Sequence, residues 1–315
     1  MYVVNKPEAT RDAYGRALLA LGQLRSEVVV LDADLSKSTK TAGFAAKYPE
    51  RFFNVGIAEA DLIGTACGLT LSGLKPFAST FAIFATGRAY DQIRNSVAYP
   101  RLPVVIAATH AGLTVGPDGG SHQSLEDIAL MRVLPNMQVW VPADGEEAYQ
   151  MVIEAATETG PVYIRLGRQV VPHVTPADYK FEKGRAQVFG PSGDVTIIAC
   201  GVMVAEALRA AEELRQAGLS VQVVNMSSIK PLDTEVLEAA ASHSRLIVTV
   251  EEHFVAGGLG SACVEYLSTL RSRPQVGMLG VEDRFGQSGH PDELLDLYGL
   301  RASNIVAAVK RSLDS

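Results

Sequence analysis

The stretch that decides the fold is Phe53-Asn54-Val55-Gly56-Ile57-Ala58-Glu59. Its pattern is typical of the end of a buried strand, a glycine turn, and a carboxylate in the first turn of a long apolar helix. The helix amides favour the ionised form of that glutamate, whereas the apolar neighbours Ile57, Leu62 and Ile63 disfavour it. Such a conflict suits a group that exchanges or shares a proton.

The composition is that of an ordinary globular protein with ample core material. The chain has 315 residues, of which 47% are apolar and 20% charged, and this length predicts about two domains. A net charge of -7 without any Lys/Arg block argues against a nucleic-acid surface. We expect a cytoplasmic protein without a membrane segment, because no apolar run reaches the ~20 residues of a span and no signal pattern opens the chain. Cys67, Cys200 and Cys263 fit neither a disulfide framework nor a zinc site.

Strand-like and helix-like segments alternate through both halves of the chain. In the first half the expected helices are 10–24, 59–71, 86–99 and 145–157, and the expected strands are 28–31, 51–55, 103–108, 138–141 and 161–166. In the second half the expected strands are 194–200, 221–225, 246–250 and 276–280, and the expected helices are 204–216, 233–242, 260–270 and 302–312. This predicts an α/β fold of two doubly wound domains, each a mostly parallel sheet flanked by helices. A proline-containing stretch places a linker at 173–190, between domains 1–172 and 191–315.

Taken singly, most polar residues have structural interpretations. Glu251-Glu252-His253 is typical of a solvated strand end, and Gly257-Gly258-Leu259-Gly260 is more often an ordinary helix start than a phosphate loop. Thr10, Ser124 and Asp144 are expected to act as helix N-caps.

Five segments stand in a fixed order along the first half. They are Thr10-Arg11, Asp32-Ala33-Asp34-Leu35, Gly56-Ile57-Ala58-Glu59, Ser79-Thr80-Phe81-Ala82-Ile83-Phe84 and the glycine-rich stretch 110–123. In this order they resemble the pyrimidine-binding half of thiamine-diphosphate enzymes of the transketolase group. The part after the linker resembles that group's C-terminal domain, so the resemblance covers essentially the whole chain.

One motif of that family is missing. In the family a separate domain holds the diphosphate and its magnesium with Gly-Asp-Gly and a later Asn, and this chain has no such pair. The chain is therefore similar to the C-terminal section of a split transketolase, and its Met1 start weighs against a truncated fragment. The resemblance implies an N-terminal transketolase subunit that supplies the diphosphate half and binds most of the Mg²⁺ (or Ca²⁺), with no metal ligand from this chain. Two copies of each chain form the natural closed arrangement.

The resemblance also implies roles at the cofactor. Glu59 would share a proton with the aminopyrimidine ring of thiamine diphosphate and so help the cofactor lose the proton at its thiazolium C2. Phe81 and Phe84 would pack against that ring, and Asp34 would contact the cofactor. Gly87 stands where many transketolases have a Tyr, which thins the aromatic wall unless the partner completes it.

At the substrate, His110 and Asp118 match positions that face the sugar. Arg11, Ser38, His122 and Arg168 match residues that hold the substrate phosphate, a task that suits the donor fork of Arg. The predicted reaction transfers a two-carbon ketol unit from a ketose phosphate to an aldose phosphate, and it requires the complex.

Three alternatives stay open. A 1-deoxy-D-xylulose-5-phosphate synthase has a similar loop and a helix like Tyr90-Asp91-Gln92, but it normally has Arg-Ala-Gly where this chain has His110-Ala111-Gly112. The β subunit of a 2-oxo acid dehydrogenase E1 is split in a similar way but has no need of a sugar-facing His110 and Asp118. A non-catalytic assembly subunit would have no reason to retain Glu59, Asp118 and both loop histidines.

Overall fold

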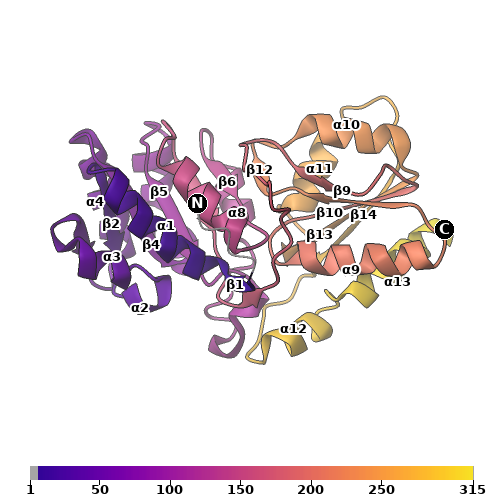
Figure 1. Ribbon diagram of the computed structural model, residues 1–315, viewed down its shortest axis with the longest axis horizontal. Coiled ribbons are helices and arrows are strands. Elements are labelled where there is room, and N and C mark those ends of the chain that lie inside the picture. Colours follow the sequence, from indigo (N-terminus) through magenta and orange to yellow (C-terminus); the bar gives the residue numbers. More distant parts are fainter. Residues whose placement is uncertain (1–5, 315) are drawn as a thin grey trace.

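The computed structural model describes residues 6–314, whose strands form two main sheets side by side (Figure 1). The strands of the larger sheet are β2 (Val28–Asp32), β3 (Phe52–Asn54), β4 (Lys75–Phe81), β5 (Val105–Thr109), β6 (Gln138–Trp140), β7 (Val162–Arg165) and β12 (Ser228–Lys230). The strands of the smaller sheet are β9 (Gln187–Phe189), β10 (Val195–Ala199), β11 (Val221–Asn225), β13 (Leu246–Phe254) and β14 (Gln275–Val281). A short antiparallel pair, β1 (Glu8–Ala9) with β8 (Val170–Val171), completes the set.

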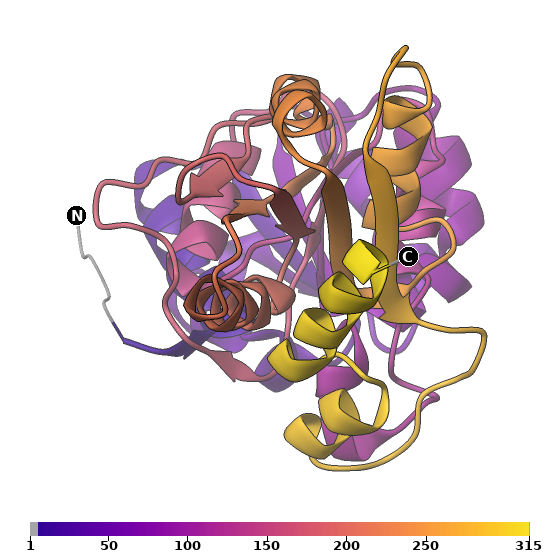
Figure 2. The ribbon, with the colours of Figure 1, turned by 90° about the vertical axis from the view of Figure 1, so that its right-hand side faces the viewer.

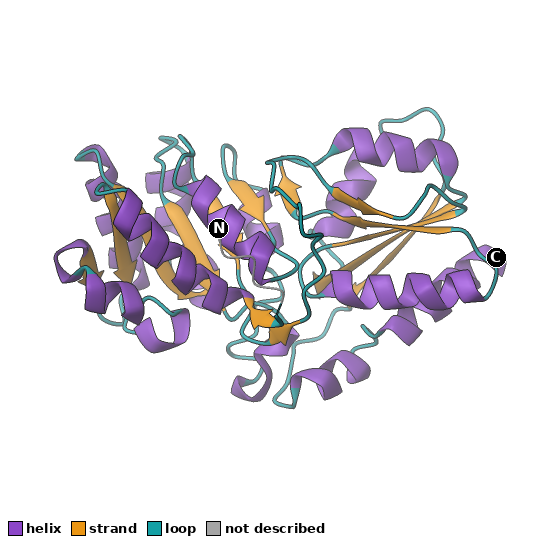
Figure 3. Cartoon of the chain, in the orientation of Figure 1, coloured by secondary structure: helices purple, strands orange, loops and turns teal. Residues whose placement is uncertain are grey.

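Both sheets are mostly parallel, as the alternation of strands and helices predicts. The seven-stranded sheet has the order β12-β6-β7-β5-β4-β2-β3 and the five-stranded sheet the order β14-β13-β10-β11-β9. Apart from β12 against β6 and β9 against β11, every pairing in these two sheets is parallel. The predicted fold class, two helix-flanked and mostly parallel sheets, is confirmed (Figure 3).

Helices cover both faces of each sheet. In the first half they are α1 (Thr10–Leu24), α2 (Ser36–Thr39), α3 (Ala42–Lys47), η1 (Pro49–Arg51), α4 (Glu59–Leu71), α5 (Ala82–Arg88), α6 (Tyr90–Gln92), η2 (Ile93–Ala98), η3 (Leu113–Asp118), α7 (Asp127–Arg132) and α8 (Gly145–Ala155). In the second half they are α9 (Met203–Gln216), α10 (Thr234–His243), α11 (Leu259–Leu267), α12 (Pro291–Leu297) and α13 (Ala302–Asp314). Figures 1 and 2 show α10 and α11 on one face of the smaller sheet and α9 and α13 on the other.

The two faces of the larger sheet follow from the period-2 alternation of its strands. In β2, Val28 and Val30 pack with α1 and α8, whereas Val29 and Leu31 pack with α4 and η2. Every residue of β2 is buried, which explains its unbroken apolar run.

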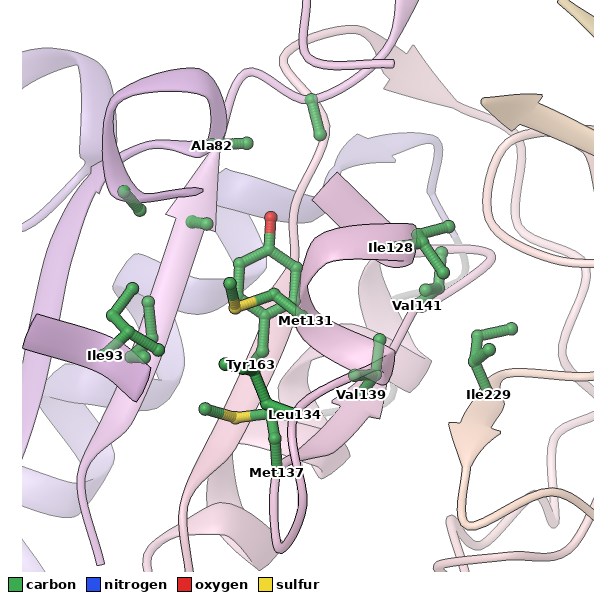
Figure 4. Close-up of a cluster of buried hydrophobic side chains, with 14 of the residues drawn as sticks. Ala82, Ile93, Ile128, Met131, Leu134, Met137, Val139, Val141, Tyr163 and Ile229 are labelled. Atoms are coloured by element: carbon green, nitrogen blue, oxygen red, sulfur yellow. The ribbon is translucent and has the colours of Figure 1, made fainter. Parts of the chain in front are cut away.

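The second half of the chain contributes an edge strand to the larger sheet. After β11 the chain returns and β12 pairs with β6, so that Ile229 packs beside Val139 and Val141 (Figure 4). The sequence did not predict β12. The strand β9 falls within the stretch 173–190, and the domain and linker boundaries given above stay a prediction.

Some local predictions were wrong. Asp144 caps α8 by accepting a hydrogen bond from Glu147 N at 2.9 Å, as expected. Thr10 and Ser124 do not cap, because α1 and α7 begin after Ala9 and Glu126, neither of which makes a side-chain cap.

Over residues 6–314, no helix has the length and apolar character needed to cross a lipid bilayer.

Candidate active site

The candidate site lies at the carboxyl ends of four adjacent strands. Phe81 ends β4, His110 follows β5, Asp34 follows β2, and Glu59 begins α4 after β3 and the Gly56 turn. Because β5, β4, β2 and β3 are neighbours in the sheet, these ends meet along one edge, where doubly wound sheets bind ligands. Gly56 has a φ of +73°, a conformation that L side chains rarely adopt.

Glu59 is buried, and its carboxylate is paired with an exposed arginine. Only 4% of Glu59 is accessible, and its Oε1 accepts a hydrogen bond from Arg88 Nη1 at 3.2 Å. The Arg88 side chain is 55% exposed, and its guanidinium carbon lies 4.2 Å from the centroid of the Phe84 ring. The sequence analysis missed Arg88, although its place four residues after Phe84 puts it on the same face of α5. Ile57, expected among the apolar neighbours, is exposed instead.

Aromatic rings form a continuous wall next to this ion pair. Phe81 and Phe84 stack with centroids 5.7 Å apart and an interplanar angle of 14°. The His110 ring also stacks on Phe81, with centroids 3.8 Å apart, and His122 meets Phe84 edge-on at 5.5 Å. The structure thus brings together four residues that lie in two separate segments of the sequence.

His110 is buried and held in one orientation. Arg11 Nη1 lies 3.0 Å from His110 Nε2, and Thr109 Oγ1 lies 2.9 Å from Nδ1. Since Arg11 can only donate, Nε2 accepts and the proton of the neutral ring resides on Nδ1. Burial, reinforced by the positive charges of Arg11 and Arg168, lowers the pKa of His110 to about 3. The imidazole is therefore uncharged at neutral pH.

Two guanidinium groups approach each other beside His110. Burial lowers the pKa of Arg11, and the positive charge of Arg168 lowers it further. Arg11 Nε is buried without a hydrogen-bond partner among the described residues, and Arg11 Nη1 also donates to Ser38 O at 3.1 Å. Arg168 Nη1 donates to Asp118 Oδ1 at 2.8 Å and to Val115 O at 3.0 Å. Two cations with spare donors make a place where an anion is stabilised.

Asp34 lies at the exposed end of β2 and is tied to the Glu59 turn. Its φ is +63°, and it exchanges two hydrogen bonds of 3.1 Å with the Asn54 side chain. Asn54 Oδ1 also accepts from Gly56 N at 3.0 Å. Asn54 was not predicted as a site residue, and it fixes the position of Asp34 relative to the turn before α4.

The interpretation of the second-half polar residues changes with the structure. Glu251, Glu252 and His253 are buried within β13, so the expected solvated strand end was wrong. Leu259 N and Gly260 N, at the start of α11, already donate to the Glu251 carboxylate. These amides are therefore not available to bind a phosphate. In residues 6–314 no three His, Cys, Asp or Glu side chains group in a way that could hold a metal ion.

Comparison with known families covers both halves of the chain. Residues 6–174 match the family described as "Transketolase, pyrimidine binding domain", and residues 184–305 match "Transketolase, C-terminal domain". The chain belongs to the transketolase family. Proteins of this family use thiamine diphosphate.

Relatives of similar length are also transketolase sections or subunits. A Methanocaldococcus jannaschii protein described as a transketolase C-terminal section is 45% identical over 96% of each chain. The 6-deoxy-6-sulfo-D-fructose transketolase subunit of a Clostridium species is 40% identical over 95% of this chain and 92% of its own. A 1-deoxy-D-xylulose-5-phosphate synthase of Carboxydothermus hydrogenoformans is 37% identical, but the match spans only 46% of that enzyme.

One solved structure matches this chain over nearly its full length. It is titled "Split gene transketolase, inactive beta4 tetramer", and it superposes with a TM-score of 0.91 at 55% identity, covering 98% of this chain and 99% of the other. The predicted resemblance to the C-terminal section of a split transketolase is thereby confirmed.

Proposed function

We propose that this chain is the C-terminal subunit of a two-chain transketolase. It would transfer a two-carbon ketol unit between ketose and aldose phosphates with thiamine diphosphate, and only together with an N-terminal subunit that binds the diphosphate and Mg²⁺ (or Ca²⁺). Two copies of each chain would make the closed assembly. The observation that carries the proposal is the buried carboxylate of Glu59, which lies next to stacked aromatic rings at the carboxyl edge of the larger sheet.

The residues around Glu59 fit an aminopyrimidine ring. Arg88 places a flat group with N–H donors over the Phe84 ring while it donates to Glu59. A flat heterocycle with ring and amino nitrogens has the same two requirements, an aromatic face to stack on and a carboxylate to bond. Arg88 therefore marks where such a ring would lie, and its exposed side chain is free to move aside.

Bound thiamine diphosphate would supply a carbanion at C2 and an electron sink for the bonds that break and form. Glu59 would share a proton with the pyrimidine ring, which requires a carboxyl group able to lose and regain that proton. Phe81 and Phe84 would pack against the ring and exclude water, and this strengthens the Glu59 contact. Asp34 would contact the cofactor from the neighbouring strand end.

The polar groups beyond the aromatic wall suit a phosphorylated sugar. His110, neutral and fixed by Arg11 and Thr109, would bond the donor's oxygens near the scissile carbon bond. Asp118 would meet the sugar hydroxyls, and Arg168 holds its carboxylate in place. The substrate phosphate would bind Arg11, Arg168, Ser38 and His122, and the unpaired N–H of Arg11 supports this assignment.

The test is a substrate comparison with the reconstituted complex. We expect turnover of xylulose 5-phosphate with ribose 5-phosphate and none of pyruvate with glyceraldehyde 3-phosphate. The opposite preference would assign the chain to the reaction for which the 37% identical relative, a 1-deoxy-D-xylulose-5-phosphate synthase, is named. A complex that binds thiamine diphosphate but transforms neither pair would leave an assembly role and refute the proposal.

A further inference from the structure

The loop of residues 110–123, which carries His110, Asp118 and His122, is held by the second half of the chain. Glu252, in β13, accepts a hydrogen bond from Thr114 N at 2.5 Å, across 138 positions of sequence. A Cβ on Gly112 would lie 2.3 Å from Glu252 Oε2, so the carboxylate fills the space that only a glycine leaves open. The carboxylate therefore touches the loop at two places between His110 and Asp118.

Other contacts from the second half hold the remainder of the loop. Gln123 Nε2 donates to Leu113 O at 3.1 Å and to Gln287 O at 3.0 Å, which ties the end of the loop to its beginning and to the segment before α12. Pro291, the first residue of α12, packs against Gly116, since a Cβ added to Gly116 would lie only 3.2 Å from the proline ring. The loop is thus sandwiched between its own sheet and the smaller-sheet half.

The position of Glu252 is itself fixed by a buried ion pair. Arg165 Nη2 donates to the Glu252 carbonyl at 2.9 Å and to Ser124 O at 3.2 Å, and Arg165 Nε pairs with Asp127 at 2.8 Å. Arg165 and Asp127 are the charged groups that act on Glu252 from the elements packed against it. Burial raises the pKa of Glu252 to about 6, although Arg165 and the Thr114 hydrogen bond oppose that rise. Near neutral pH the acceptor is therefore a buried carboxylate, which binds an N–H more strongly than a neutral oxygen does.

We propose that Glu252 is a positioning residue for the sugar-facing loop, so that the second half of the chain sets the geometry of Asp118 and His110. This rests on the proposed function for its link to the sugar, whereas the hold on the loop is a property of the chain alone. The smaller-sheet half then contributes to donor binding without touching the substrate.

The first measurement uses the free chain and amide hydrogen exchange. In Glu252→Leu, which keeps the bulk and loses the acceptor, exchange in the peptide that contains Thr114 should rise about tenfold or more. Glu252→Gln retains an acceptor oxygen and should restore most of that protection. The matched control is Glu251→Leu, because this adjacent buried carboxylate bonds the amides of α11 and not the loop. Unchanged exchange at Thr114 in Glu252→Leu would overturn the proposal.

The second measurement uses the reconstituted complex and separates positioning from loss of folded protein. Glu252→Leu should raise the KM of the ketose phosphate donor about tenfold, with kcat normalised to the concentration of folded active sites. The affinity for thiamine diphosphate should stay unchanged, and Glu252→Gln should restore the wild-type KM. An equal rise in Glu251→Leu, or a fall in kcat alone, would show a merely structural role and reject the proposal. If the wild-type complex transfers no ketol unit, the proposed function fails while the exchange result still decides whether Glu252 holds the loop.

Discussion

Two helices of this protein begin beside a buried glutamate, and the two carboxylates have opposite surroundings. Glu59 is the first residue of α4, and Glu251 lies in β13 against the first turn of α11. Their side chains are 4% and 1% exposed. Glu59 follows the carboxyl end of β3, Glu251 lies in the carboxyl half of β13, and both are near a glycine turn, so sequence pattern and burial alone do not separate them.

The hydrogen bonds do separate them. Both oxygens of Glu251 accept backbone N–H groups, from Leu259 at 2.7 Å and from Gly260 at 2.8 Å. Within residues 6–314 Glu59 instead pairs with Arg88, a side chain that can move into solvent. A buried carboxylate is thus a candidate for catalysis when its oxygens can be released to a ligand, whereas one that caps a helix is structural.

The largest expected effect comes from removing the exchangeable proton at Glu59. In the reconstituted complex, Glu59→Gln should lower ketol transfer by about 10³-fold or more, because an amide bonds the ring but cannot exchange the proton. Glu251→Gln is the matched control and should stay within about threefold of the wild type, because its carboxylate does not reach the site. Near-normal turnover of Glu59→Gln, measured at saturating cofactor, would erase the distinction between the two carboxylates.

The next effect concerns the cation pair beside His110. Arg168→Ala should lower kcat/KM for xylulose 5-phosphate by about 30-fold, since hydrogen bonds to charged groups contribute roughly 1.5–3 kcal/mol. Unphosphorylated xylulose should be affected far less. Arg185→Ala, which removes a surface arginine paired with Glu235, serves as the control. An equal loss with both sugars would mean that Arg168 only positions Asp118 and does not bind the substrate phosphate.

The buried carboxyl group of Glu251 should make the free energy of unfolding depend on pH. Burial raises the pKa of Glu251 from 4.5 to about 7, so the folded state binds this proton more tightly than the unfolded chain does. Its contribution to stability is therefore full below pH 4.5 and lost as the pH rises through 7. The melting temperature of wild type relative to Glu251→Gln should fall between pH 5 and pH 8, by an amount equivalent to about 2 kcal/mol. A constant difference, or one of opposite sign, would contradict the assignment.

The smallest effect is expected at Arg88. Glu59 is buried but the Arg88 guanidinium is exposed, so the range of a solvent-exposed pair applies, about 0.2–1 kcal/mol. On that basis Arg88→Ala should tighten thiamine diphosphate binding by the complex at most about fivefold. Isothermal titration of the cofactor would measure this, with Arg185→Ala again as the control. Weaker binding by Arg88→Ala would mean that Arg88 holds the cofactor rather than leaving its place.

The sequence predicted the elements well where the hydrophobic periodicity is clear, and poorly where polar residues interrupt it. The boundaries of α1 and α4 were predicted to the residue. The central strand β4 was missed because Lys75, Pro76, Ser79 and Thr80 interrupt its pattern, although all seven of its residues are buried. Lys75 is accommodated by donating to Glu158 O at 2.7 Å, a contact no local pattern reveals.

The candidate site was predicted through the order of its motifs, but its partners were not. Phe81, Phe84, His110 and His122 do come together, and Arg11 and Arg168 lie beside them. Arg88, Asn54 and Glu252 were missed because each contacts a residue that is distant in sequence, namely Glu59, Asp34 and Thr114. Glu252 in particular contacts the 110–123 loop from the opposite half of the chain, and only the folded structure joins the two.

The most direct test of the central claim, that Glu59 serves a cofactor bound between two polypeptides, is a titration of thiamine diphosphate with Mg²⁺. It would be carried out on this chain alone, on the diphosphate-binding subunit alone, and on their mixture, with ketol transfer followed in parallel. We predict saturable binding and turnover in the mixture and no turnover by this chain at any cofactor concentration. Ketol transfer by the purified single chain would contradict the claim.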